Sequence, residues 1–207
     1  MECLARELLD LHRDREQAVL ELACGTGNLT CELGRPVGLA VGVDVSETML
    51  VRAAERARGV GLSNVAYVRA AAEALPFATG VFDAVCCFVA LHLFADPFGA
   101  LGRVHDILRP RGGSRSSPRC AALPHRRVRS SRRSGVLTGL RLFGRDELVD
   151  ALRRCGFEVA NRRIAGLTQV WRHGAAEGGA RPPSATRAAA LRAPARRCAA
   201  RCAAPRR

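Results

Sequence analysis

Two glycines, Gly25 and Gly27, follow an apolar stretch at residues 18–22 and precede residues 28–33, which can begin a helix. Glycines at such a place let a ligand approach the backbone closely, and the first N–H groups of the following helix point toward that ligand. The acidic Glu21 stands just before the turn. A carboxylate there is poorly placed for a pyrophosphate and suits a ligand that carries an ammonium group. The turn is therefore predicted to bind a small ligand with a positively charged end.

A second acidic residue, Asp44, lies near the end of the next apolar stretch, residues 37–45. A carboxylate at that position can accept hydrogen bonds from the 2′- and 3′-hydroxyls of a ribose. A dinucleotide site would require a third glycine where Thr30 stands. S-adenosylmethionine has an ammonium group and a ribose but no pyrophosphate, so it fits these residues better. The alternative is a tight turn without a ligand, with Asp44 as an ordinary surface carboxylate.

Segments with the spacing of strands alternate along the chain with segments that have the spacing of helices. Strands are expected at residues 18–22, 37–45, 65–68 and 82–88, and helices at 28–33, after the N-cap Ser46, and at 97–108. A later helix is expected at 142–155, and an antiparallel pair at 157–164 and 167–171. This order predicts an α/β fold, a Rossmann-like doubly wound and mostly parallel sheet with a C-terminal antiparallel hairpin.

The net charge of +14 over 207 residues is unevenly distributed. Residues 1–108 hold 9 Arg against 14 acidic residues, a net −5, whereas residues 109–207 hold 24 Arg against 5 acidic residues, a net +19. The chain contains no lysine, although phosphate-binding surfaces normally mix Lys and Arg. Aromatic residues make up 4%, which leaves few for base stacking. We therefore expect no specific binding to nucleic acid.

The nine cysteines include no CxxC pair, and free, reduced thiols are expected. Cys198 and Cys202 form only a weak zinc pattern with no histidine nearby, so no metal site is predicted. No segment has the pattern of a signal peptide, and the longest apolar run, residues 84–94, is too short to span a membrane. The sequence thus predicts a soluble, cytoplasmic protein with no membrane span; it predicts no particular oligomeric state.

The alternation of strands and helices breaks after Pro110. Residues 111–135 are rich in Arg and Ser and contain no apolar run able to form a central strand, so the fifth strand is expected to be disrupted. One hypothesis is that this segment is encoded out of frame; a genuine Arg-rich insertion is the alternative. Residues 174–207 have the composition of a disordered tail, which leaves residues 1–173 as the predicted domain.

Several of these motifs together resemble the class I S-adenosylmethionine-dependent methyltransferases, especially the branch that includes quinone-biosynthesis and many small-molecule enzymes. The similar segments are 19–27 at the first strand and turn, 43–50 at the end of the second strand, 73–77 and 82–85 around the fourth strand, 91–92 after it, 108–113 before the fifth strand, and 143–171 at the C-terminal helix and hairpin. The resemblance implies the fold predicted above and S-adenosyl-L-methionine as the cofactor. It does not indicate one substrate.

The resemblance also implies roles for individual residues. Glu21 would lie near the methionine ammonium, and Asp44 would bind the ribose hydroxyls. The other positions that it places around the cofactor are Ala23, Gly25 and Gly27 along the methionine and ribose, Val45 and Met49 beside the adenine, Ala71 and Ala72 at the adenine edge, and Phe88 beside the sulfonium.

The sequence departs from the family pattern at three positions. Ala23 stands where the family usually has glycine, so its methyl group can crowd the cofactor. Ala71 stands where the family usually has an aspartate that accepts from the adenine amino group, and loss of one such bond weakens binding by about 0.5–1.5 kcal/mol. Arg111 is inserted into the usual Pro-Gly-Gly turn.

His92 is the candidate general base, because it follows the fourth predicted strand on the side expected to face the ligand. A packing or capping histidine is the alternative. Three functions remain open: methyl transfer to a small-molecule acceptor, a degenerate cofactor-binding protein without activity, and a nucleic-acid methyltransferase. The third lacks the Asn/Asp-Pro-Pro-aromatic motif that amino-directed nucleic-acid enzymes carry near the fourth strand. A small-molecule methyltransferase is the function that the sequence favours.

Overall fold

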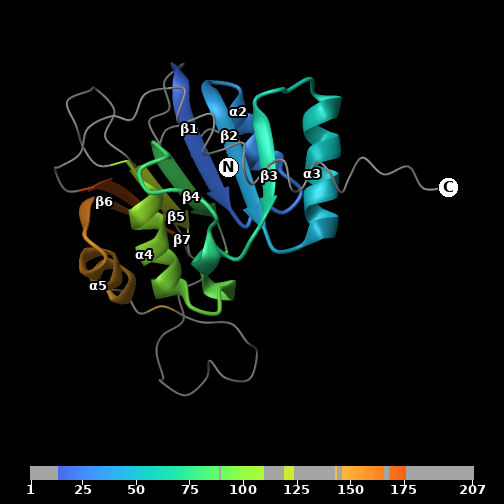
Figure 1. Ribbon diagram of the computed structural model, residues 1–207. Helices are drawn as coiled ribbons and strands as arrows, with labels where there is room; N and C mark the ends of the chain where they lie inside the picture. Colours follow the sequence, from blue (N-terminus) through green and yellow to red (C-terminus); the bar gives the residue numbers. More distant parts are fainter. Residues whose placement is uncertain are drawn as a thin grey trace.

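A computed structural model of the chain describes residues 14–88, 90–109, 119–123, 143, 146–165 and 168–175. Its centre is a five-stranded sheet in the order β3-β2-β1-β4-β5, in which every neighbouring pair is parallel. The strands are β1 (Asp14–Leu22), β2 (Val37–Asp44), β3 (Val65–Arg69), β4 (Ala84–Phe88) and β5 (Arg119–Leu123). Figure 1 shows β1 between β2 and β4. The predicted Rossmann-like α/β fold is confirmed.

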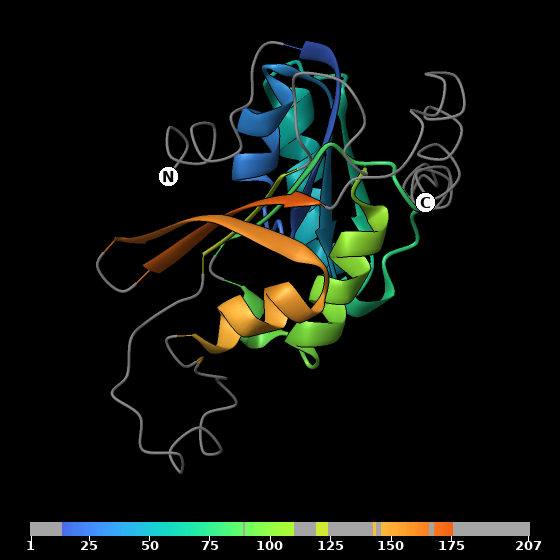
Figure 2. The ribbon, with the colours of Figure 1, turned by 90° about the vertical axis from the view of Figure 1, so that its left-hand side faces the viewer.

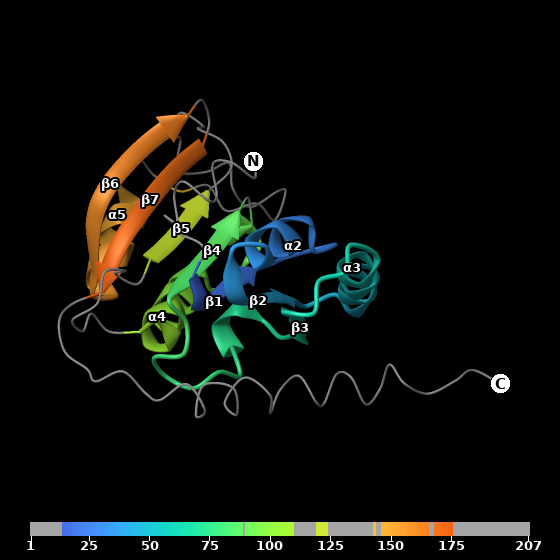
Figure 3. The same cartoon turned by 90° about the horizontal axis from the view of Figure 1, so that it is seen from above.

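Helices connect these strands and cover both faces of the sheet. They are α2 (Asn28–Gly34), α3 (Glu47–Gly59), α4 (Pro97–Ile107) and α5 (Glu147–Arg154), with short 3-10 helices η1 (Ala72–Ala74) and η2 (Leu91–Leu93). α2 and α4 lie on opposite faces of the sheet (Figure 3). The predicted N-cap of α3 is confirmed, because Ser46 Oγ accepts a hydrogen bond from the Met49 N–H at 3.4 Å.

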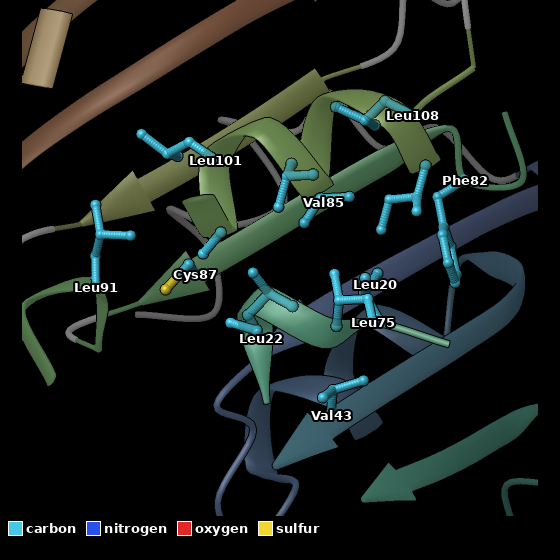
Figure 4. Close-up of a cluster of buried hydrophobic side chains, with 14 of the residues drawn as sticks. Leu20, Leu22, Val43, Leu75, Phe82, Val85, Cys87, Leu91, Leu101 and Leu108 are labelled. Atoms are coloured by element: carbon cyan, nitrogen blue, oxygen red, sulfur yellow. The ribbon is translucent and has the colours of Figure 1, made fainter. Parts of the chain in front are cut away.

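The strand β1 separates two clusters of buried apolar side chains. Val19 packs toward α2 together with Leu33, whereas Leu20 packs on the other face in the larger cluster that α4 and α5 cover (Figure 4). Successive side chains of a strand point to opposite faces. Glu21 therefore shares the face of Val19, under α2.

The expectation of a disrupted fifth strand is wrong for residues 119–123. This segment forms β5, which pairs in parallel with β4 from Ala84↔Arg119 to Phe88↔Leu123. A strand edge has unpaired N–H and C=O groups that favour pairing with another segment, and the backbone of residues 119–123 pairs with the edge of β4. The remainder of residues 111–135 lies outside the described part of the chain, so the hypothesis of an out-of-frame origin stays untested.

The predicted C-terminal hairpin is present as β6 (Phe157–Ala165) and β7 (Thr168–Ala175), which pair antiparallel in a separate ladder. β7 lies beside β5, so the hairpin lies along the β5 edge of the sheet (Figures 2 and 3). Only Gly174 and Ala175 of the predicted tail fall within the described residues, where they end β7. In the parts of the chain that the structure describes, no helix has the length and apolar character needed to cross a membrane.

Candidate functional site

The predicted ligand turn follows β1 at the edge of the sheet where the parallel strands end. Three of its residues have positive φ angles: 52° at Ala23, 53° at Gly25 and 73° at Gly27. The turn is fixed by hydrogen bonds from the Cys24 N–H to the Val43 carbonyl and from the Gly27 N–H to the Cys24 carbonyl, both at 3.0 Å. Ala23 carries a side chain in a conformation that costs a non-glycine residue about 1–2 kcal/mol, at the position where the family pattern has glycine.

Asp44 stands opposite this turn at the end of β2, and backbone amides hold both of its carboxylate oxygens. The Gly25 N–H donates to Oδ2 and the Ser46 N–H donates to Oδ1, each at 2.9 Å. A carboxylate oxygen has two lone pairs, so each oxygen keeps an acceptor site after these bonds are made. Asp44 is half-buried. It therefore offers two fixed acceptors that a ribose diol could use.

The two glycines of the turn serve different purposes. A Cβ on Gly25 would meet no atom within 4 Å, so the space beside this backbone is open. A Cβ on Gly27 would lie 2.5 Å from Tyr67 Oη and 2.8 Å from Ala53 Cβ. The absent side chain of Gly27 therefore allows β3 and α3 to pack against the turn, whereas Gly25 leaves room for a ligand.

Glu21 is buried at the end of β1, with 5% of its surface exposed. The hydroxyl of Thr30 donates a hydrogen bond to Glu21 Oε2. The pKa of Glu21 is raised to about 7, mainly by burial and to a smaller extent by the negative charge of Asp44, while the hydrogen bonds from Thr30 act in the opposite direction. Glu21 is therefore a carboxyl group whose charge changes near neutral pH.

The residues expected around an adenine follow β2 and β3. Val45 and Met49, the two residues expected beside the adenine ring, are exposed, to 62% and 37%. Ala71 is half-buried with an extended backbone (φ −77°, ψ 151°) and precedes η1, in which Ala72 is buried. The Ala70 N–H donates to the Asp44 carbonyl at 3.2 Å. This bond holds the segment after β3 against the end of β2.

Phe88 and His92 come from the segment that follows Cys87 in β4 and continues into η2. Phe88 is half-buried at the last position of β4. His92 is buried in η2, with 8% of its surface exposed. A base buried to this degree is shielded from bulk water, and the role of His92 stays a prediction. Nearby, Glu73 Oε1 accepts from the Asp96 N–H at 3.0 Å, which gives Glu73 a structural partner at the start of α4.

Sequence reasoning missed three side chains at the turn, which are Cys24 within it, Thr30 from α2 and Tyr67 from β3. The Cys31 Sγ and Tyr67 Oη atoms are 3.5 Å apart, and burial is the main reason that the pKa values of Cys24 and Tyr67 are raised. Tyr67 is the only tyrosine of the chain, and its position at the turn depends on the packing of β3, which no local sequence pattern indicates. Within the described residues, no group of three His, Cys, Asp or Glu side chains could hold a metal ion.

Gly42 is the position in β2 that makes room for these side chains. A Cβ there would lie 2.8 Å from Cys24 Sγ, 2.8 Å from Tyr67 Cδ1 and 2.9 Å from Thr30 Oγ1. Side chains from the turn, from β3 and from α2 therefore pack into the space that a side chain at position 42 would occupy.

Gly42→Ala is expected to lower the free energy of unfolding by about 1–3 kcal/mol, because the added methyl group overpacks a closed site. Urea unfolding followed by circular dichroism measures this change. The matched control is Gly59→Ala at the end of α3, where a Cβ would meet no atom within 4 Å and stability should be unchanged or slightly raised. Equal losses in the two variants would contradict the packing described for Gly42.

Comparison with known proteins gives one matching family and a group of sequence relatives. Residues 19–112 match the methyltransferase domain family. A ubiquinone/menaquinone biosynthesis C-methyltransferase, UbiE, from Blochmanniella pennsylvanica is 41% identical over 98 residues, which cover 45% of this chain and 39% of the relative. UbiE from Escherichia coli O1:K1 is 41% identical over 102 residues, which cover 47% of this chain and 41% of the relative. The chain spans about two fifths of the length of these curated relatives.

Solved structures resemble a larger part of the chain at lower identity. The [4+2]-cyclase SpnF has a TM-score of 0.74 at 19% identity, covering 86% of this chain and 80% of its own. A methyltransferase described as putative from Bacillus halodurans has a TM-score of 0.66 at 20% identity, covering 78% and 71%. An S-adenosylmethionine-dependent methyltransferase from Aquifex aeolicus has a TM-score of 0.65 at 17% identity, covering 82% and 87%. At these identities the likeness establishes a shared fold.

Proposed function

Residues 19–112 match the methyltransferase domain family, and from this premise we propose that the chain is a class I S-adenosylmethionine-dependent methyltransferase, which binds S-adenosyl-L-methionine and transfers its methyl group to a small molecule. The observation that carries the proposal is the pair of backbone amides that orient Asp44 across from the open space at Gly25. A carboxylate held in this way is suited to a ribose diol. No other arrangement described above combines fixed acceptors with open space.

The residues of the site fit most parts of this cofactor. Asp44 provides acceptors for the ribose, the turn at Gly25 leaves room for the backbone to approach it, and Glu21 provides a carboxylate for the ammonium. The exposed side chains of Val45 and Met49 would pack on the adenine ring.

Two features of the site fit the cofactor less well. Ala71 offers no acceptor to the adenine amino group, and Ala23 has a methyl group at a positive φ angle. The proposed site also includes Gly27, whose role is to close the turn, together with Ala72 at the adenine edge and Phe88 beside the reacting sulfur.

When bound, S-adenosylmethionine supplies a methyl group activated on a positively charged sulfur. The protein's task is to hold the acceptor in line with this methyl group and to exclude water. Phe88, half-buried at the end of β4, would provide an apolar wall there. His92 would take a proton from an oxygen or nitrogen acceptor, whereas an activated carbon acceptor needs no such base.

A small-molecule acceptor is supported by the relatives named as quinone-biosynthesis C-methyltransferases. The fold alone does not decide the reaction, because one structural neighbour is named as a cyclase. A cofactor-binding protein without activity is the second candidate, and Ala23 and Ala71 favour it. We also propose a cytoplasmic location, since Cys24, Cys31 and Cys155 form no disulfide; cell fractionation checks this point.

Calorimetric titration of the full chain with S-adenosylmethionine and with its demethylated product tests the proposal. We expect both ligands to bind at one site and to compete with each other. Cofactor labelled in the methyl group then separates the two candidates, because an active enzyme moves label into an added small-molecule extract. A folded protein that binds neither ligand would overturn the proposal, and binding without any transfer of label would favour the inactive alternative.

Ala71→Asp is expected to tighten cofactor binding by about threefold to tenfold, because it restores an acceptor for the adenine amino group. The extended backbone at this position accepts an aspartate without strain. Calorimetry measures the change, and Ala74→Asp, which adds the same charge at an exposed position of η1, is the control. Equal effects in the two variants would contradict the placement of Ala71 at the adenine edge.

A further inference from the structure

The helix α2 lacks a capping side chain of its own. Its N-cap residue is Gly27, which has no side chain to accept a hydrogen bond from the first turn. Instead, the hydroxyl of Thr30 in its first turn donates a hydrogen bond to the carboxyl group of Glu21 in the neighbouring strand β1. The N–H groups of the first helical turn have no partner within the helix. Glu21 and Thr30 thus join β1 to α2 directly beneath the ligand turn.

Thr30 can reach Glu21 because of the residues that surround it. Thr30 is fully buried, with 0% of its surface exposed, and its hydroxyl approaches the strand β2 at the place where Gly42 has no side chain. The Thr30 side chain therefore has one fixed position, and its hydroxyl holds one carboxyl oxygen of Glu21 in place.

We propose that Thr30 is a positioning residue, whose hydroxyl fixes and supports the ionised carboxylate of Glu21 for the ammonium group of bound S-adenosylmethionine. This inference rests on the proposed function of the site. It goes further in one respect: Thr30 would not contact the cofactor, but its hydroxyl would increase the affinity for the cofactor through Glu21.

The charges around Glu21 support this assignment. The titratable groups that interact with it are Asp44 from β2, Cys24 from the turn and Tyr67 from β3. Cys86 is its neighbour in β4, and Cys31 contacts Tyr67. Carboxyl, thiol and phenol groups carry no positive charge, so none of these side chains offers a cation to Glu21. The hydrogen bonds from Thr30 lower the pKa of Glu21 against the effect of burial, and a bound ammonium would favour the ionised form further.

The test is a calorimetric titration of the full chain between pH 6 and pH 8.5, using the parent protein, Thr30→Val and Thr30→Ser. Valine has the shape of threonine without the hydroxyl, and serine keeps the hydroxyl. Each protein is titrated with S-adenosylmethionine, with S-adenosylhomocysteine, and with 5′-methylthioadenosine, which keeps the adenosine but lacks the ammonium group. The last ligand is the matched control for any general damage to the site.

The parent protein should bind the two ammonium ligands more tightly as the pH rises through about 7, where Glu21 becomes ionised. Thr30→Val should weaken their binding at pH 7 by about five- to tenfold and move the rise to higher pH, because a smaller fraction of Glu21 is ionised. Thr30→Ser should restore affinity to within about threefold of the parent. Binding of methylthioadenosine should depend little on pH or on either substitution.

Equal losses for all three ligands in Thr30→Val would mean a merely structural role and would overturn the inference. So would a folded Thr30→Val protein with the parental pH profile. If Thr30→Val fails to fold, the release of protons by the parent protein on ligand binding is measured instead. Calorimetric titration at pH 6.5 in buffers of different ionisation enthalpy should show proton release with the two ammonium ligands and none with methylthioadenosine.

The same titrations separate this inference from the proposed function. Failure of the parent protein to bind any of these ligands would overturn the proposed function itself. Loss of binding in Asp44→Ala with no effect of the Thr30 substitutions would overturn this inference alone.

Discussion

Asp44→Ala is expected to weaken the binding of S-adenosylmethionine by about 1.5–3 kcal/mol, roughly a tenfold to 150-fold rise in the dissociation constant. The substitution removes a charged acceptor for two ribose hydroxyls. It also leaves the N–H groups of Gly25 and Ser46 without the carboxylate to which they donate, so the turn loses the contact that orients it. Calorimetry on the purified variant measures the affinity, and circular dichroism shows whether the variant is folded.

A suitable control for this experiment is Glu47→Ala. Glu47 lies three positions further along the chain and carries the same charge, but its side chain is 65% exposed and pairs with Arg69 on the surface. Surface pairs of this kind contribute little, so cofactor affinity should stay within about twofold of the parent. An Asp44→Ala protein that binds as tightly as the control would show that the ribose is not bound here.

Glu21→Gln is expected to make the free protein more stable above neutral pH. The pKa of Glu21 in the folded protein is raised to about 7 from 4.5, so between these values the folded state holds a proton that the unfolded state has released. Stability therefore falls as the pH rises through this range, and above pH 7 the buried charge costs about 3 kcal/mol. Glutamine removes this cost but keeps only one acceptor oxygen for Thr30.

Urea unfolding at pH 5 and at pH 8.5 measures this effect as a difference between variant and parent. The advantage of Glu21→Gln over the parent should grow with pH, while cofactor affinity should fall because the carboxylate is lost. Glu55→Gln, at an exposed position of α3, should change stability by less than about 0.5 kcal/mol at both pH values. A pH-independent difference between Glu21→Gln and the parent would contradict the buried, titrating carboxyl group.

The features that could be predicted from the sequence are those that depend on short stretches of neighbouring residues. The alternation of strands and helices follows from the spacing of apolar residues, and the places of Gly25 and Asp44 follow from where two strands end. The N-cap at Ser46 is a local feature as well. These features are set by residues that are close to one another in the sequence.

The features that could not be predicted depend on side chains that are distant in the sequence. Thr30 was interpreted as the absence of a third glycine, but its hydroxyl contacts Glu21. Gly27 was assigned to the ligand, and that assignment stays a prediction; the packing of Tyr67 from β3 into the space beside Gly27 was not expected. The strand β5 was not expected because residues 119–123 have low strand propensity; its pairing comes from the edge of β4.

The two exposed apolar side chains beside Asp44 have a thermodynamic consequence. Val45 and Met49 are in contact with water in the free protein, and an adenine ring resting on them would remove that apolar surface from solvent. Such burial makes the heat capacity of the complex lower than that of its separated components. The enthalpy of cofactor binding should therefore become more favourable as the temperature rises, and this slope should decrease when Val45 is replaced by serine.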